Sequence, residues 1–159
     1  MGVDSWATII SGRLTARVGD YPPVERLLHR APTDTLIVDR QQLLAAATRA
    51  TAISAAVAAK TTPVRLTVDP TGVILAPAND HSPARVTAPL VPALAGSVDT
   101  SWTTGLNPAY LLDAVKSLTT DQVVLYLADP ATPVMLTDDG AARVTYQHMM
   151  MPVRLTQDT

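Results

Sequence analysis

Residues 105–118 read GLNPAYLLDAVKSL and carry the clearest local structural signal in the chain. Asn107 is a residue type that accepts hydrogen bonds from the free N–H groups at a helix start, and Pro108 suits the first helical position. The apolar residues recur at helical spacing, so they share one face directed at a core: Leu111, Val115 and Leu118. The polar residues lie opposite: Asp113 and Lys116. The stretch predicts an amphipathic helix.

A second helix is predicted upstream, from Asp39 to about residue 58. Asp39 can cap it, and Gln42 three residues later completes the pattern of a capping box. Helical spacing groups four residues on a face that we expect to pack: Leu44, Ala47, Thr51 and Ala55. The opposite face is polar: Gln42, Arg49 and Lys60.

The remaining regular structure is predicted to be β-strand. Residues 6–18 suggest two short strands around a turn at Gly12 and Arg13, and residues 19–34 contain a Pro-rich linker. Residues 64–76 alternate around a turn at 69–72 and predict a hairpin. Further strands are expected at 35–38, 84–88 (weakly), 98–104, 123–127, 134–136 and 143–155. This order predicts an α+β domain with two helices packed on one face of an antiparallel sheet.

Composition limits the function classes. The chain has 159 residues, 47% of them hydrophobic and 16% charged, which is enough for one packed domain. A net charge of −2 excludes a simple basic nucleic-acid binder, although it allows a basic patch. The absence of cysteine excludes disulfides, thiolate metal sites and cysteine nucleophiles. No signal peptide or membrane-spanning stretch is recognisable, so we expect a soluble, cytoplasmic protein.

Signatures of catalysis are sparse. The three histidines, His29, His81 and His148, lack metal-ligand spacing, and no glycine-rich phosphate loop is present. Residues 138–140, Asp-Asp-Gly, suit either a cation or a hairpin turn, and the turn is favoured. We therefore predict no catalytic residues, no metal and no cofactor.

Two surfaces leave alternatives open. Residues 148–155 read HMMMPVRL, and three successive methionines make both faces of a strand apolar. That strand is either fully buried or presents one soft, adaptable face to partners. Arg49, Lys60 and Lys116 lie on or near polar helix faces. They either contact phosphates without reading sequence or belong to ordinary solvated surface, which periodicity alone favours.

Two stretches closely resemble the third domain of the bacterial DNA polymerase III beta subunit, the sliding clamp: residues 105–118 and the ending MPVRL at 151–155. Three further matches follow in the same order: 38–44, 64–66 and 128–134. By this resemblance, residues 33–159 form the third clamp domain, and residues 1–32 are a remnant of the second domain and its linker. The family's first domain and most of its second have no counterpart in the chain.

The resemblance implies a DNA replication processivity factor that does no chemistry. In the family, a homodimeric ring surrounds double-stranded DNA and tethers polymerase III subunits and repair proteins through a short peptide motif. The implied peptide-binding residues here are Pro22, Arg26, Leu27, Met149, Met150, Met151, Pro152, Val153 and Arg154. The implied DNA-facing charges are Arg49, Lys60 and Lys116. The expected role is that of a truncated or partial clamp chain, and the alternative is a peptide-binding or regulatory module that forms no ring.

Overall fold

The computed structural model describes residues 5–10, 13–18, 32–57, 63–78, 90–98, 101–139 and 146–155. The chain divides into two compact units, Met1–Arg30 and Ala31–Thr159. In the first unit, β1 (Ser5–Ile10) and β2 (Arg13–Val18) pair antiparallel, as predicted for this stretch.

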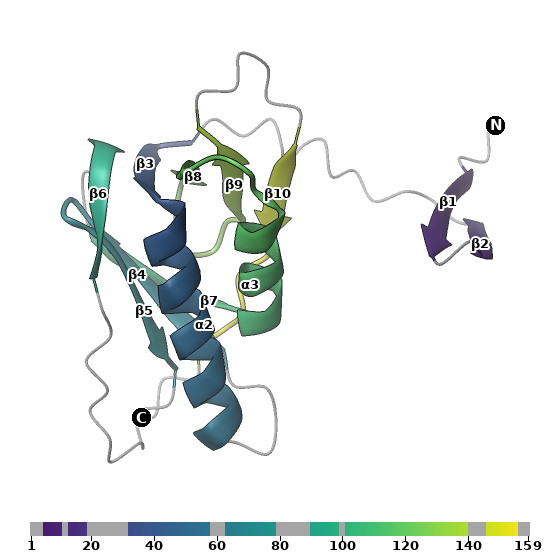
Figure 1. The fold of residues 1–159 in the computed structure, drawn as a ribbon, viewed down its shortest axis with the longest axis horizontal. Coiled ribbons are helices and arrows are strands. Elements are labelled where there is room, and N and C mark those ends of the chain that lie inside the picture. The colour runs from purple at the N-terminus through teal and green to yellow at the C-terminus, as the bar shows by residue number, and fades with distance from the viewer. Residues whose placement is uncertain are drawn as a thin grey trace. The chain divides into compact units, whose positions relative to one another are not determined.

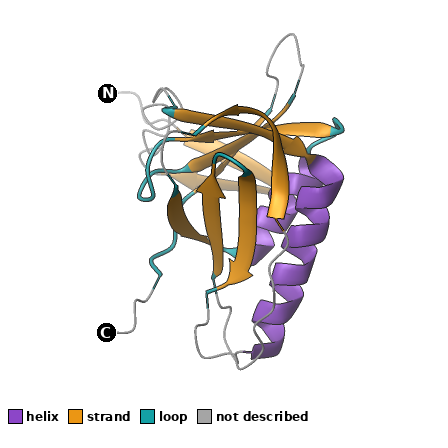
Figure 2. Ribbon diagram, turned by 90° about the vertical axis from the view of Figure 1, so that its left-hand side faces the viewer, coloured by secondary structure: helices purple, strands orange, loops and turns teal. Residues whose placement is uncertain are grey.

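The second unit is an α+β fold, as the sequence predicts. Its strands, in order along the chain, are β3 (Asp34–Asp39), β4 (Val64–Asp69), β5 (Gly72–Pro77), β6 (Leu90–Ser97), β7 (Trp102–Leu106), β8 (Gln122–Leu127), β9 (Val134–Asp138) and β10 (Gln147–Met150). Neighbouring strands pair antiparallel in the order β10-β9-β8-β3-β6-β5-β4-β7. The helices α2 (Arg40–Val57) and α3 (Pro108–Ser117) lie side by side and cover the same side of these strands (Figures 1 and 2).

α3 packs as its sequence predicts. Its expected apolar face is buried, and Asp113 and Lys116 are exposed. Asn107 caps the helix: its Oδ1 accepts hydrogen bonds from the N–H of Ala109 at 3.0 Å and of Tyr110 at 3.5 Å. The buried face joins a core built from alternate residues of the strands, which include Leu36, Leu66 and Leu125.

The packing face predicted for α2 is correct only in part. Of its expected members only Ala47 is buried, while Leu44 and Thr51 are half-buried and Ala55 is exposed. The residues that α2 buries are Leu43, Ala46, Ala47, Ala50 and Ser54. The Thr51 hydroxyl lies 3.5 Å from the carbonyl oxygen of Pro108 in α3. The predicted face therefore turns partly toward α3, and the many alanines of α2 supply little contrast to locate the face that meets the sheet.

Three strand predictions shift. The strand expected at 143–155 is β10 (Gln147–Met150), and residues 151–155 follow it with one isolated bridge. The strand expected at 98–104 is β7 (Trp102–Leu106), and β6 (Leu90–Ser97) lies in a stretch expected to hold one weak strand at 84–88, which is outside the described residues. β6 is hard to recognise because Pro92 and Gly96 interrupt its pattern. Gly96 has a φ of 122° and lies against the Thr35 backbone, where a side chain would collide.

Candidate functional site

The methionine run divides between core and surface. β10 ends the strand order and pairs only with β9 among the described strands, so it is not a buried central strand. Met150 is 4% exposed and belongs to the core, Met149 is half-buried, and Met151, just past the strand, is 57% exposed. The adaptable apolar surface therefore begins where β10 ends.

Within three residues of the end of β10, the chain reaches β7, the strand at the other end of the strand order, and is anchored on it. The N–H of Val153 donates a hydrogen bond of 2.8 Å to the carbonyl oxygen of Gly105, which forms one antiparallel bridge. A Cβ on Gly105 would lie 2.4 Å from the oxygen of Val153 and 2.8 Å from Cδ2 of Leu155. Glycine is therefore required at this position because the tail approaches so closely.

A groove of about 610 Å³ lies beside this anchored tail, which we define as residues 151–155. Three segments line it: the β7 residues Thr103, Thr104 and Gly105, the turn residues Pro130 and Ala131, and the tail residues Met151, Pro152, Val153, Arg154 and Leu155. The turn is held against β7 because the Thr104 hydroxyl donates a 2.7 Å hydrogen bond to the carbonyl oxygen of Pro130. The groove thus combines segments that are distant in sequence.

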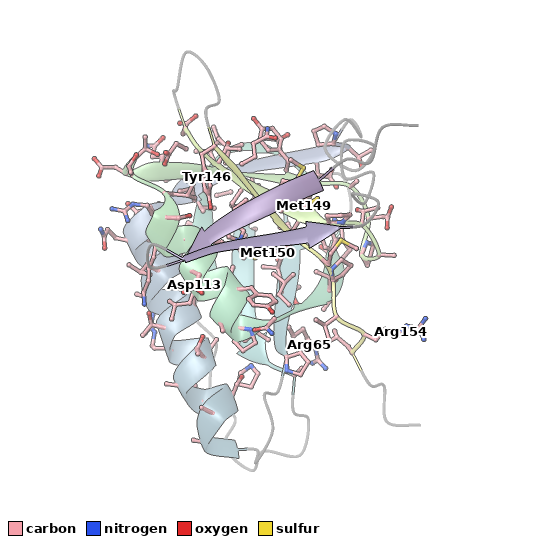
Figure 3. All side chains as sticks on the ribbon, turned by 90° about the vertical axis from the view of Figure 1, so that its right-hand side faces the viewer. Arg65, Asp113, Tyr146, Met149, Met150 and Arg154 are labelled. Atoms are coloured by element: carbon pink, nitrogen blue, oxygen red, sulfur yellow. The ribbon has the colours of Figure 1, made fainter. Side chains whose placement is uncertain are left out.

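The groove is mainly apolar and carries a positive charge at its border. Met151 is 57% and Val153 38% exposed, so two large apolar side chains of one short segment are open to solvent beside each other, as at interaction sites. Arg154 is the charged residue among those that line the groove, and its side chain projects outward from the tail (Figure 3). Such a surface suits an extended segment with apolar side chains and a nearby negative charge.

The structure brings four of the nine expected peptide-binding residues together in the groove: Met151, Pro152, Val153 and Arg154. Met149 and Met150 lie in β10 and are not among its lining residues, and Met150 supports the site from the core instead. Pro22, Arg26 and Leu27 are outside the described residues.

Sequence reasoning missed the other walls of the groove. These are Thr103, Thr104, Gly105, Pro130, Ala131 and Leu155. Gly105 and the turn at 128–134 fall in stretches with motif resemblance, which was the available signal. Nothing local in either stretch shows that the tail meets them.

Two of the three expected DNA-facing charges are displayed on the two helices. Arg49 is exposed on α2, Lys116 is exposed in the last turn of α3, and Lys60 is outside the described residues. Arg40, at the start of α2, has a structural task instead: its Nε donates a 2.7 Å hydrogen bond to the carbonyl oxygen of Thr120.

The two aspartates with shifted pKa values, Asp69 and Asp138, accept hydrogen bonds that hold a turn and a loop. The hydroxyl and N–H of Thr71 hydrogen-bond to Asp69 and lower its pKa. Burial raises the pKa of Asp138, but hydrogen bonds from Thr120 and Thr119 outweigh it, so the pKa is lowered. These bonds tie the end of β9 to the loop after α3, which gives Asp138 a structural role. Within the described ranges, no three His, Cys, Asp or Glu side chains are grouped to hold a metal, and neither helix is long and apolar enough to cross a membrane.

Comparisons with known proteins agree on one family. The model of the DNA polymerase III beta subunit, C-terminal domain, matches residues 25–153. The beta sliding clamp of Synechococcus elongatus is 31% identical over 144 residues, which cover 89% of this chain and 36% of that protein. The chain therefore spans about a third of the length of this curated relative.

Solved structures show the same fold. The DNA polymerase sliding clamp of Pseudomonas aeruginosa, solved with a ligand, superposes with a TM-score of 0.71 at 26% identity, covering 89% of this chain and 37% of that one. The Bacillus subtilis sliding clamp, at 19% identity, shares the fold with a TM-score of 0.73, covering 97% and 40%. The chain belongs to the DNA polymerase III beta subunit family, the bacterial sliding clamps, and carries the family's C-terminal domain.

Proposed function

We propose that this chain is a non-catalytic part of a DNA replication processivity factor, a sliding clamp that tethers DNA polymerase III subunits and other clamp-motif proteins to DNA in the cytoplasm. The observation that carries the proposal is the apolar groove formed where the tail crosses β7. Family membership makes a clamp-motif peptide the expected occupant. Residues 33–159 would form the third clamp domain, and residues 1–32 would be the remnant of the second domain and its linker.

In this proposal, the exposed side chains of the tail make the main contacts. Met151 is flexible and polarizable, so it adapts to different apolar side chains, and Val153 adds a second apolar contact. Arg154 pairs with an acidic group or a terminal carboxylate of the peptide. Pro22, Arg26 and Leu27 are proposed to contact the same peptide, as is Met149 of β10. Met150 acts indirectly, by holding the start of the tail on the core.

Arg49, Lys60 and Lys116 are proposed to face the duplex. Two adjacent helices that display separated positive charges suit weak, sequence-independent phosphate contacts, which allow a protein to move along DNA. Arg49 and Lys116 are exposed, which this role requires. The ring itself would be a homodimer completed by domains that the 159 residues do not contain.

The experiment that tests the groove is a fluorescence-polarization titration with a labelled clamp-motif peptide from a replicative polymerase subunit. Met151→Asp places a charge in the apolar groove and is expected to weaken binding by about tenfold or more. Leu94→Asp is the matched control, because Leu94 is 51% exposed on β6, outside the residues that line the groove. It should bind like the wild type.

Two outcomes would count against this site. One is the lack of saturable binding by a chain whose circular dichroism and cooperative melting show that it is folded. The other is an equal loss of affinity in Met151→Asp and Leu94→Asp. Topological retention on nicked circular DNA, lost when the DNA is linearised, separates a ring component from a peptide-binding module that forms no ring.

A further inference from the structure

The outer edge of β7 offers backbone hydrogen-bonding groups to the groove. β7 ends the strand order and pairs with β4 on one side. On the other side, the carbonyl oxygen of Gly105 accepts the N–H of Val153 at 2.8 Å. In an antiparallel strand, the N–H and C=O of one residue point the same way, and the direction alternates from residue to residue. The N–H and C=O of Thr103, two residues before Gly105, therefore also point away from β4.

Side-chain geometry supports this orientation independently. Thr103 lies opposite Thr67 in the ladder of β4 and β7, and their hydroxyl oxygens are 3.1 Å apart. Opposed side chains come closest at pairs that do not exchange backbone hydrogen bonds with each other. Thr103 and Thr67 form such a pair, so the backbone groups of Thr103 are available on the outer side of the sheet.

The groove follows this strand edge. Thr103, Thr104 and Gly105 all line it, although successive side chains of a strand point to opposite faces of the sheet. Contact with three consecutive residues of β7 places the groove beside the edge of this strand. Among the described residues, the tail meets this edge at one isolated bridge, between Gly105 and Val153, and Leu155 forms no bridge with Thr103.

We propose that the peptide in the groove binds as an added β-strand, with its backbone paired to the N–H and C=O of Thr103. The inference rests on the proposed function, which places a peptide in the groove, and adds how that peptide is held. An extended peptide suits this edge because one of its residues presents an N–H and a C=O to the same side. These two groups match the C=O and N–H of Thr103. The alternate side chains of the peptide then reach Met151 and Val153, so the main-chain hydrogen bonds add affinity to the side-chain contacts of the tail.

The first arm of the test changes the protein. Thr103→Pro removes the outward N–H, and it leaves the bonds to β4 in place because this N–H takes no part in them. Thr103→Val is the matched control: it also loses the hydroxyl but keeps the N–H. In polarization titrations with the same labelled clamp-motif peptide, Thr103→Pro should bind about tenfold more weakly than Thr103→Val, and equal binding by the two variants would overturn the inference.

The second arm changes the peptide and needs no variant, so it decides the question even if Thr103→Pro fails to fold. Clamp-motif peptides N-methylated at one position at a time are titrated against the wild-type chain. Pairing with Thr103 predicts that affinity falls at one position and not at its two neighbours, because the N–H groups of neighbouring residues point away from β7. A loss at every position, or at none, would overturn the inference.

The outcomes separate this inference from the function on which it rests. If the unmodified peptide binds, Met151→Asp abolishes binding and the N-methyl scan is flat, the groove is a peptide site but strand addition is wrong. If the folded wild-type chain does not bind the peptide, both proposals fail. If Thr103→Pro abolishes self-association in sedimentation velocity but leaves peptide binding intact, a second copy of the chain occupies the edge and the inference is overturned.

Discussion

α2 and α3 pack side by side on the same sheet, but their sequences specify their orientation to different degrees. In α3, leucine and valine alternate with charged residues, and the predicted buried face is the observed one. In α2, alanine occupies both buried positions such as Ala46 and exposed ones such as Ala55, and the predicted face is rotated away from the observed one.

The difference shows which residues fix the rotation of a helix about its own axis. Turning a leucine toward water loses most of its burial free energy, so α3 has one favourable rotation. Turning an alanine toward water loses little, so the rotation of α2 follows from close approach to its neighbours. Small residues on α2 allow the sheet and α3 to pack closely against it. The stabilisation from this packing depends on the shapes of the sheet and of α3 as well as on α2.

The largest effect is expected from truncation of the buried face of α3. Leu111 is buried against the core, and Leu111→Ala should destabilise the fold by about 2–5 kcal/mol through lost burial and a residual cavity. Chemical denaturation monitored by circular dichroism measures this. Tyr110→Ala, at the neighbouring exposed position, should cost much less. Equal losses would show that α3 is not oriented as described.

Enlarging α2 distinguishes its observed face from its predicted one. Ala46→Leu should cost about 1–3 kcal/mol, because a buried alanine in close contact leaves no space for a larger side chain. Ala55→Leu, at an exposed position, should change stability by less than about 0.5 kcal/mol. Thermal and urea unfolding of both variants provide the comparison, and the reverse order would support the face predicted from sequence.

The N-caps of α2 and α3 should contribute equally to stability, although the buried faces of the two helices are specified differently. Oδ1 of Asn107 accepts from the start of α3, and Oδ1 of Asp39 accepts the N–H of Gln42 at 2.8 Å in α2. Alanine at either position should cost about 1 kcal/mol, and serine should restore most of that stability. A rescue by serine in one helix and not in the other, seen in urea titrations, would contradict equal capping.

The smallest effect concerns the loop after α3 and depends on pH. Hydrogen bonds from Thr119 and Thr120 lower the pKa of Asp138 from its ordinary value of 3.8 despite the opposing effect of burial. Because the folded-state pKa lies below the unfolded one, the stabilisation is complete above the unfolded value and is lost as the pH falls through the folded one.

Asp138→Asn removes this titration. Unfolding free energies of the wild type and the variant, measured from pH 7 down to pH 2, should therefore differ most at neutral pH and converge in acid. Asp139→Asn is the control, because it removes an adjacent carboxylate that is not the acceptor of these bonds. A constant gap between wild type and Asp138→Asn across the whole range would show that the carboxylate charge is not responsible.

Like the two helices, the candidate site has features that the sequence specifies and features that only the tertiary structure decides. Residues 151–155 were recognisable in the sequence as an unusual apolar tail with a family motif, and four of them were expected at a peptide site. Whether each methionine faced the core or the solvent depended on β10 being an edge strand and on the tail leaving it after Met150. Met150 thus became core and Met151 became surface.

The sequence by itself determined the elements that depend on short-range physics. These are the two caps, the face of α3, the hairpin of β4 and β5, and the α+β order, all set by hydrogen bonds and periodicities within a few residues. Only the tertiary structure decided the face of α2, the place of β6 and the walls of the groove. Those features arise because β7, the turn at Pro130 and the tail meet across long stretches of chain, and no local pattern encodes such contacts.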